Sequence, residues 1–287
     1  MAKNNDFCIF IISNGRANNV VTWRTLDNKK SKYPRYIILD DIDTQIDEYK
    51  KKYGDDKIIV FNKEEIAKTT EHGDNFWNLR TTTHARNACY NIAKDLGYTY
   101  FLVLDDDYTG FQYRIDSKFN YPTPVKSITD IDKTFNYFLD YYKSIPALSI
   151  CMAQGGDYIG GDNKFGVGRT QYSRKAMNSW FCSIDRPIKF ISRLNEDVNT
   201  YLTLGSRGDL FLTVPFVSLS QLATQKSKGG MTQAYIDGGT YVKSFYTVMY
   251  CPSFCKIDLM GTTNKRLHHK IKWNNAVPKI ISPIHKK

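Results

Sequence analysis

Tyr100-Phe101-Leu102-Val103-Leu104-Asp105-Asp106-Asp107 is the stretch from which the fold is predicted. Its five leading residues form an apolar run without alternation, which is typical of a parallel strand covered on both faces. Three adjacent carboxylates raise one another's pKa unless a cation neutralises them. Mg²⁺ or Mn²⁺ suits such hard oxygen ligands. The stretch therefore predicts a buried strand that ends in a metal site, and the alternative is an acidic turn.

The residues before this stretch repeat the same pattern of strand and helix. Apolar runs at Phe7–Ile12, 36–39 and 57–61 predict three further buried strands. Helices are predicted at 18–26, 44–53 and 82–96, the last with a regular apolar stripe. This alternation indicates an α/β fold, with a mostly parallel central sheet and helices on both faces. Ligands of such sheets bind at the carboxyl ends of the strands. Polar residues lie at these predicted ends: Ser13, Asn14, Arg16, Asp40, Asp41 and the three aspartates 105–107.

The second half of the chain is less regular. A helix is predicted at 128–142, a strand at 210–217, a polar loop at 225–232 and an alternating strand at 241–249. Residues 265–287 are predicted to form a basic tail. No repeat or long linker divides the sequence. We therefore expect one domain over 1–287, with a nucleotide-binding half at 1–110 and an acceptor-side half at 111–287.

The charge balance favours acidic partners. Lys and Arg number 40 against 29 Asp and Glu, a formal net charge of +11. Such a charge favours association with nucleic acid, phosphates or anionic surfaces, although compositional bias produces it too. The six scattered cysteines form no paired zinc motif. No apolar run is long enough for a membrane span or a signal peptide, so a reduced, cytoplasmic location is expected.

Three further groups of residues are candidates for chemistry. Arg86, at the start of the predicted helix 82–96, holds a phosphate or orients the aspartates, with a plain surface arginine as the alternative. Glu196 and Asp197 offer a general base for an attacking hydroxyl, or else begin a solvated helix. Near the C-terminus, histidines are candidates for completing a metal shell and lysines for neutralising a diphosphate, with a basic surface tail as the alternative. These four residues are His268, His269, Lys270 and Lys272.

The ordered set of these segments resembles GT-A glycosyltransferases, which combine a parallel sheet with an Asp-x-Asp metal motif and a later acidic pair. The resemblance is closer to the TET/JBP-associated glycosyltransferases, a group that includes the base J glucosyltransferase and many phage proteins. It spans nearly the whole chain. The segments that carry it are Leu104-Asp105-Asp106-Asp107-Tyr108, Asn195-Glu196-Asp197-Val198, Lys228-Gly229-Gly230-Met231-Thr232 and Leu267-His268-His269 through Trp273 to Lys279.

The resemblance implies roles for these residues. A UDP-sugar, with UDP-glucose as the first candidate, lies across the strand ends and contacts Asp40 or Asp41 through its uridine. Asp105 lies near the ribose, Asp107 holds Mn²⁺ or Mg²⁺, and His268 or His269 adds a ligand. Asp197 deprotonates the acceptor, and the sugar is transferred with inversion.

The resemblance further implies that the acceptor is a hydroxymethylated pyrimidine, hydroxymethyluracil or hydroxymethylcytosine, in double-stranded DNA. The alternatives are a protein, lipid or glycan acceptor, a nucleotidyltransferase that releases pyrophosphate, and a DNA-binding protein without activity. The salt dependence of acceptor binding would distinguish DNA from a saccharide acceptor, because nucleic-acid binding weakens steeply with salt. The basic residues predicted to contact DNA are Arg169, Arg174, Lys175, Lys226 and Lys228.

Overall fold

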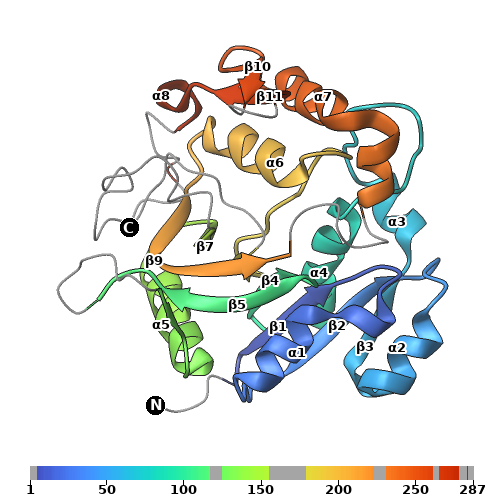
Figure 1. Cartoon of the computed structure of the whole chain (residues 1–287), viewed down its shortest axis with the longest axis vertical. Coiled ribbons are helices and arrows are strands. Elements are labelled where there is room, and N and C mark those ends of the chain that lie inside the picture. The colour runs from blue at the N-terminus through green and yellow to red at the C-terminus, as the bar shows by residue number, and fades with distance from the viewer. Residues whose placement is uncertain are drawn as a thin grey trace.

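The computed structural model describes residues 5–116, 125–154, 179–222, 231–260, 265–277 and 283 (Figure 1). The predicted DNA contacts at Arg169, Arg174, Lys175, Lys226 and Lys228 all lie outside these residues. Among the helices that are described, none has the length and apolar character needed to cross a membrane.

A nine-stranded sheet, in the order β3-β2-β1-β4-β8-β7-β9-β5-β6, forms the centre of the molecule. Its first half is parallel, with Ile12 of β1 in register with Asp105 of β4. The polar residues that follow these strands therefore meet at one edge, as the sequence predicted. The four strands are β1 (Phe7–Ile12), β2 (Arg35–Asp40), β3 (Ile58–Phe61) and β4 (Tyr100–Asp105).

The other half of the sheet is mixed. β8 pairs antiparallel with β4 and β7, and β5 pairs antiparallel with β9 and β6, whereas β7 and β9 are parallel. Strands from both halves of the sequence thus share one sheet. The five strands are β5 (Tyr108–Tyr113), β6 (Lys126–Ser127), β7 (Ser149–Gln154), β8 (Ser179–Ser183) and β9 (Phe211–Gln221).

Helices cover both faces of the sheet, which confirms the predicted α/β class. Alternate residues of β1 contribute to two separate cores: Phe7, Ile9 and Ile11 to one, and Cys8, Phe10 and Ile12 to the other. The first core includes residues of α1 (Val21–Asn28), α2 (Ile46–Tyr53) and α5 (Ile131–Ser144). The second is covered by α3 (Lys63–Lys68), α4 (Thr83–Asp95) and α6 (Glu196–Gly205). Short 3-10 turns lie at Ala17–Asn19 and Asp55–Lys57.

The C-terminal elements gather beyond α6, at the top of Figure 1. They are α7 (Thr232–Tyr250), which is interrupted at Gly239, the hairpin of β10 (Cys255–Met260) and β11 (Arg266–Ile271), and α8 (Trp273–Ala276). Part of the predicted basic tail is therefore folded, and Ala276 is buried.

The strand predicted at 241–249 is wrong, because these residues belong to α7. Small polar residues, Ser244 and Thr247, are fully buried on the inner side of this helix. Its larger apolar residues Tyr241, Phe245 and Met249 are exposed. Tyr246 is buried as well, but because Ser244 and Thr247 are polar, the spacing of the apolar residues did not indicate a helix.

Candidate active site

The turn after β4 is held in place by hydrogen bonds from α1. The hydroxyl of Thr22, in α1, donates to the carbonyl of Asp105 at 2.5 Å and accepts from the amide of Tyr108 at 2.9 Å. The amide of Thr22 donates to the carbonyl of Asp106 at 3.0 Å. One threonine thus fixes the backbone of the aspartate cluster. Sequence reasoning missed Thr22, whose only signal was its position early in the first helix.

Asp105 accepts a hydrogen bond from Arg86 at 2.9 Å. A second nitrogen of the same guanidinium lies 3.0 Å from Glu196. Burial alone would lower the pKa of Arg86, but the carboxylates of Asp105 and Glu196 raise it above its usual range. Arg86 is only 2% exposed. Of the two roles considered from sequence, the structure shows the orienting one, and this guanidinium is covered by protein.

Asp106 faces the loop after β1. Its two carboxylate oxygens accept from the hydroxyl of Ser13 at 2.6 Å and from the guanidinium of Arg16 at 2.7 Å. Tyr49, which the sequence analysis did not single out, bonds to the Ser13 hydroxyl and the Arg16 amide, each at 2.8 Å. Burial raises the pKa of Asp106 although Arg16 and Ser13 oppose that shift. Asp106 is therefore buried and fastens the loop of residues 13–16 to the aspartate turn.

The aspartates after β2 differ in environment. Asp40 is buried and forms an ion pair of 2.7 Å with Lys63, while Asn14 donates to the same oxygen at 3.2 Å. Asp41 is exposed and accepts from the backbone amide of Lys63 at 3.0 Å. Asp40 thus positions Asn14 at the strand ends, and Asp41 faces solvent. Lys63 is a further residue that the sequence analysis did not identify.

Asp107 is the least satisfied carboxylate of the cluster. Burial, followed by the charges of Asp105 and Asp106, raises its pKa to about 7. Within the described part of the chain, no side chain bonds its carboxylate. Its carbonyl accepts from Leu222, just after β9, at 3.1 Å. A positive ion would relieve the electrostatic penalty on this carboxylate.

The acidic pair at the start of α6 is divided between two environments. Glu196 is buried, bonds to Arg86 and accepts a hydrogen bond from the hydroxyl of Thr82. Burial raises the pKa of Glu196, although Arg86 lowers it. Asp197 is partly exposed, and no hydrogen bond or ion pair of its carboxylate is found among the described residues. Asp197 is thus the member of the pair that is accessible to solvent.

The preceding residue, Asn195, has left-handed backbone geometry, with φ of 55°. Its side-chain amide donates to the carbonyl of Lys243 at 3.0 Å and to the hydroxyl of Thr247 at 3.1 Å. The same nitrogen lies 3.3 Å from Nδ1 of His269. The turn that presents Asp197 is therefore supported by α7 and by the C-terminal hairpin.

The remaining predicted residues lie on this hairpin. The rings of His268 and His269 are 4.1 Å apart, and His269 is buried against Asn195. Lys270 lies 3.1 Å from Asp258, and hydrogen bonding to Lys270 lowers the pKa of Asp258 to about 2. Lys272 is exposed. Among described residues, no three His, Cys, Asp or Glu side chains group as metal ligands, so the histidines are not assembled with the aspartates.

Comparison with known proteins identifies a family. A family model described as TET-Associated Glycosyltransferase matches residues 7–230. No curated protein matches the chain.

Two solved structures are similar over 92% of this chain. One is titled as a mycobacterial protein, with a TM-score of 0.49, 6% identity and 83% of its own chain covered. The other is glucosyl-3-phosphoglycerate synthase from Mycobacterium tuberculosis in complex with Mn²⁺, UDP and glucosyl-3-phosphoglycerate, with a TM-score of 0.48, 7% identity and 87% covered.

Proposed function

Because the chain belongs to the TET-associated glycosyltransferase family, we propose that it transfers a sugar from a UDP-sugar to a hydroxymethylated pyrimidine in DNA. Glucose is the sugar that we propose first, and the transfer is inverting and metal-dependent. The observation that carries the mechanism is that carboxylates lie at two different places, at the end of β4 and at the start of α6. The aspartates 105–107 lie at the end of β4, and the partly exposed Asp197 lies at the start of α6. Arg86 links Asp105 to Glu196, the neighbour of Asp197.

Asp107 and Asp105 are the residues that would hold the metal ion. They fit a hard divalent cation, because Asp107 is a carboxylate of raised pKa with two carboxylates beside it. Two carboxylates suffice for Mg²⁺ or Mn²⁺ when substrate phosphates supply further ligands. The bound ion would stabilise negative charge on the departing diphosphate. Among the described residues His268 and His269 are not assembled with these aspartates, so either histidine would add a ligand only if the C-terminal hairpin approached the ion.

The donor nucleotide lies at the carboxyl ends of β1, β2 and β4. Asp41 is the exposed carboxylate there and contacts the uridine, while Asp40 keeps Asn14 in position. Asp105 lies beside the ribose, oriented by Arg86. Arg16 and the hydroxyl of Ser13, fixed by Asp106, shape the same edge. Lys270 and Lys272 offer positive charge for the diphosphate.

Asp197 acts as the general base. Its carboxylate takes the proton from the acceptor hydroxyl as that oxygen attacks the anomeric carbon. The new carbon–oxygen bond forms as the bond from that carbon to the diphosphate breaks, and UDP leaves with the electron pair. A single displacement of this kind inverts the anomeric configuration. Glu196 is unsuited to this step, because Arg86 and Thr82 already occupy it.

Modified DNA as the acceptor is supported by the family description and by the net charge of +11. The test is UDP release in the presence of Mn²⁺, with a panel of UDP-sugars and with DNA that carries or lacks hydroxymethylpyrimidines. We expect release from one donor only, stimulated by the modified DNA and suppressed by salt. Stimulation by a protein or glycan instead would overturn the acceptor assignment, and release of pyrophosphate would overturn sugar transfer.

A further inference from the structure

The loop of residues 69–82, which joins α3 to α4, exposes two adjacent aromatic side chains at its tip. Phe76 is 78% exposed and Trp77 is 54% exposed. Single exposed apolar residues are ordinary on protein surfaces. Two neighbouring exposed aromatic rings form a larger apolar surface, and contiguous exposed apolar surfaces mark interaction sites. In the 69–82 loop, hydrogen bonds and an ion pair hold the backbone that carries both rings.

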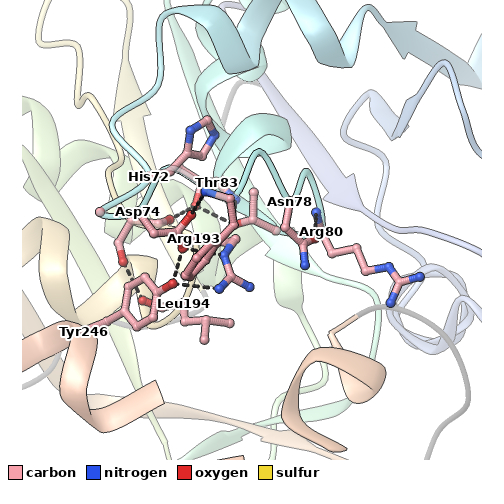
Figure 2. A network of polar contacts seen from close by, with 12 residues as sticks. His72, Asp74, Asn78, Arg80, Thr83, Arg193, Leu194 and Tyr246 are labelled. Carbon is pink, nitrogen blue, oxygen red and sulfur yellow. Dashed lines mark hydrogen bonds and ion pairs between the residues drawn. The ribbon is translucent and has the colours of Figure 1, made fainter. Parts of the chain in front are cut away.

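One side of the 69–82 loop is bonded to the segment before α6. The amide of Ser192 donates to the carbonyl of Glu71 at 2.6 Å, and the amide of Arg193 donates to that of His72 at 2.9 Å. Arg193 also forms an ion pair of 2.8 Å with Asp74 and donates to the hydroxyl of Tyr246 at 2.6 Å. Figure 2 shows Arg193 beside Asp74 and Tyr246, which themselves bond to each other.

This network fixes the tip directly. The second oxygen of Asp74 accepts from the amide of Phe76 at 3.0 Å. Trp77 has a φ of 50°, a left-handed conformation that is costly for a large side chain and persists only when its surroundings impose it. The edge of its ring meets His72, with centroids 6.0 Å apart. The two rings are therefore presented in a fixed arrangement while most of their surface remains in water.

The other end of the 69–82 loop reaches the active site. Thr82 donates to Glu196, the neighbour of the proposed base Asp197. Trp77 and Thr82 are five positions apart in the sequence, so an extended chain would place their Cα atoms at most about 18 Å apart. The tip thus lies within the reach of a polymeric acceptor that is bound at Asp197.

We propose that Phe76 and Trp77 form a stacking platform for an unpaired base of the acceptor strand. The proposal rests on the proposed function, in which DNA is the acceptor. Aromatic rings stack on the faces of nucleobases, but in a duplex these faces are covered by neighbouring base pairs. The platform therefore requires a base that is single-stranded or turned out of the helix.

Charge favours a nucleic-acid strand over a sugar ring at this tip. Arg80, four residues after Phe76, is 61% exposed, and its guanidinium forms a long ion pair of 3.8 Å with Asp237, the one ion pair found for it among the described residues. Figure 2 shows its side chain extending away from the bonded network, where its guanidinium is available to a phosphate. The carboxylate at the base of the tip, Asp74, is neutralised by Arg193. The net charge of +11 acts in the same direction.

The test measures binding of fluorescein-labelled oligonucleotides that contain 5-hydroxymethyluracil, single-stranded and duplex, by anisotropy. The wild type is compared with Phe76→Ala/Trp77→Ala, with Trp77→Phe, and with Tyr137→Ala as a matched control. Tyr137 is 52% exposed on α5, on the opposite side of the sheet from α4. Thermal melting checks that each variant is folded.

We expect each lost ring to weaken single-strand binding roughly 5- to 150-fold, the range measured for base–aromatic stacking. Trp77→Phe should retain most of the affinity, and Tyr137→Ala all of it. Trp77 is one of four tryptophans. Its stacking should quench the fluorescence of the wild type, and this quenching should be absent from Trp77→Phe.

The possible failures are distinguishable. If the wild type binds and glycosylates DNA but the double variant binds the single strand equally well, the stacking platform is refuted and the proposed function stands. If Trp77 fluorescence responds to a glycan and not to the oligonucleotide, the platform serves a saccharide and the proposal is overturned. If the wild type neither binds nor modifies any of the oligonucleotides, the proposed function itself fails.

Discussion

Arg86 lies 2.9 Å from Asp105 and 3.0 Å from Glu196, and so joins the end of a donor-side strand to the start of the helix that carries the proposed base. The two carboxylates are 91 positions apart in the sequence. This buried arginine therefore sets the relative position of the two groups on which the mechanism depends.

Replacing Arg86 with alanine should destabilise the protein. Removing one partner of a buried ion pair leaves uncompensated charge, here on Glu196 and Asp105, and typically costs about 3–5 kcal/mol. Arg86→Lys should recover only part of this loss, because an ammonium cannot reach both carboxylates with a planar fork. Urea unfolding of the three proteins measures the free energy of unfolding. If Arg86→Ala unfolded at the same urea concentration as the wild type, the bridging role of Arg86 would be contradicted.

Asp107→Ala should abolish the dependence of UDP binding on Mn²⁺. The carboxylate of Asp107, whose pKa is raised to about 7 by burial and by Asp105 and Asp106, is the group that most needs a neutralising ion. Isothermal titration of UDP with and without Mn²⁺ measures the effect. Asp95→Ala, at an exposed position at the end of α4, is the matched control and should bind as the wild type does. Unchanged Mn²⁺-dependent binding in Asp107→Ala would remove this residue from the metal site.

Asp197→Asn should lower turnover without lowering stability, whereas Glu196→Gln should lower stability. Asp197→Asn should keep its stability and donor binding and lower kcat by about 10²–10⁴-fold, since only the general base is lost. Glu196→Gln should lower the free energy of unfolding, because Arg86 and Thr82 lose a charged partner. Single-turnover kinetics and urea unfolding of both variants measure these effects. Near wild-type turnover in Asp197→Asn would show that another group takes the proton.

His84 should destabilise the folded protein as the pH drops from about 6.5 to about 4, while Asp107, whose pKa is raised to about 7, acts in the opposite direction. Burial, followed by the charges of His72 and Lys63, lowers the pKa of His84 to about 4 in the folded protein. An unfolded histidine titrates near 6.5, so between these values the unfolded state binds the extra proton and is favoured. The full shift corresponds to roughly 3 kcal/mol. In urea unfolding at a series of pH values, His84→Gln should gain stability relative to the wild type as the pH falls through this range, because it lacks the contribution of His84. An unchanged slope would show that His84 titrates normally.

The donor-side half of the fold was predictable from local patterns. The apolar runs at β1, β2, β3 and β4 are continuous, and the helix before β4 has a clear apolar stripe. The proximity of Arg86 to Asp105 followed from a helix that precedes a parallel strand. These features depend on residues close in sequence, and parallel topology then brings the strand ends together.

Long-range pairing could not be predicted in the same way. The contact between Arg86 and Glu196 joins separate halves of the chain, and so does the brace between Arg193 and Asp74. The ion pair of Lys63 with Asp40 depends on the turn after β3. In α7 the buried residues include the polar Ser244 and Thr247, while Tyr241, Phe245 and Met249 are exposed, so hydrophobic periodicity favoured a strand. In each case tertiary contacts set the role of the residue.

Nucleoside mass spectrometry of the acceptor tests the central claim most directly. The wild-type protein, Mn²⁺ and UDP-glucose are incubated with duplex DNA that carries hydroxymethyluracil or hydroxymethylcytosine, and the DNA is digested to nucleosides. We predict one added hexose on one of the two modified pyrimidines, and no such product with Asp197→Asn on the same timescale. Release of UDP with unmodified nucleosides, and the sugar recovered on a protein or glycan, would contradict DNA as the acceptor.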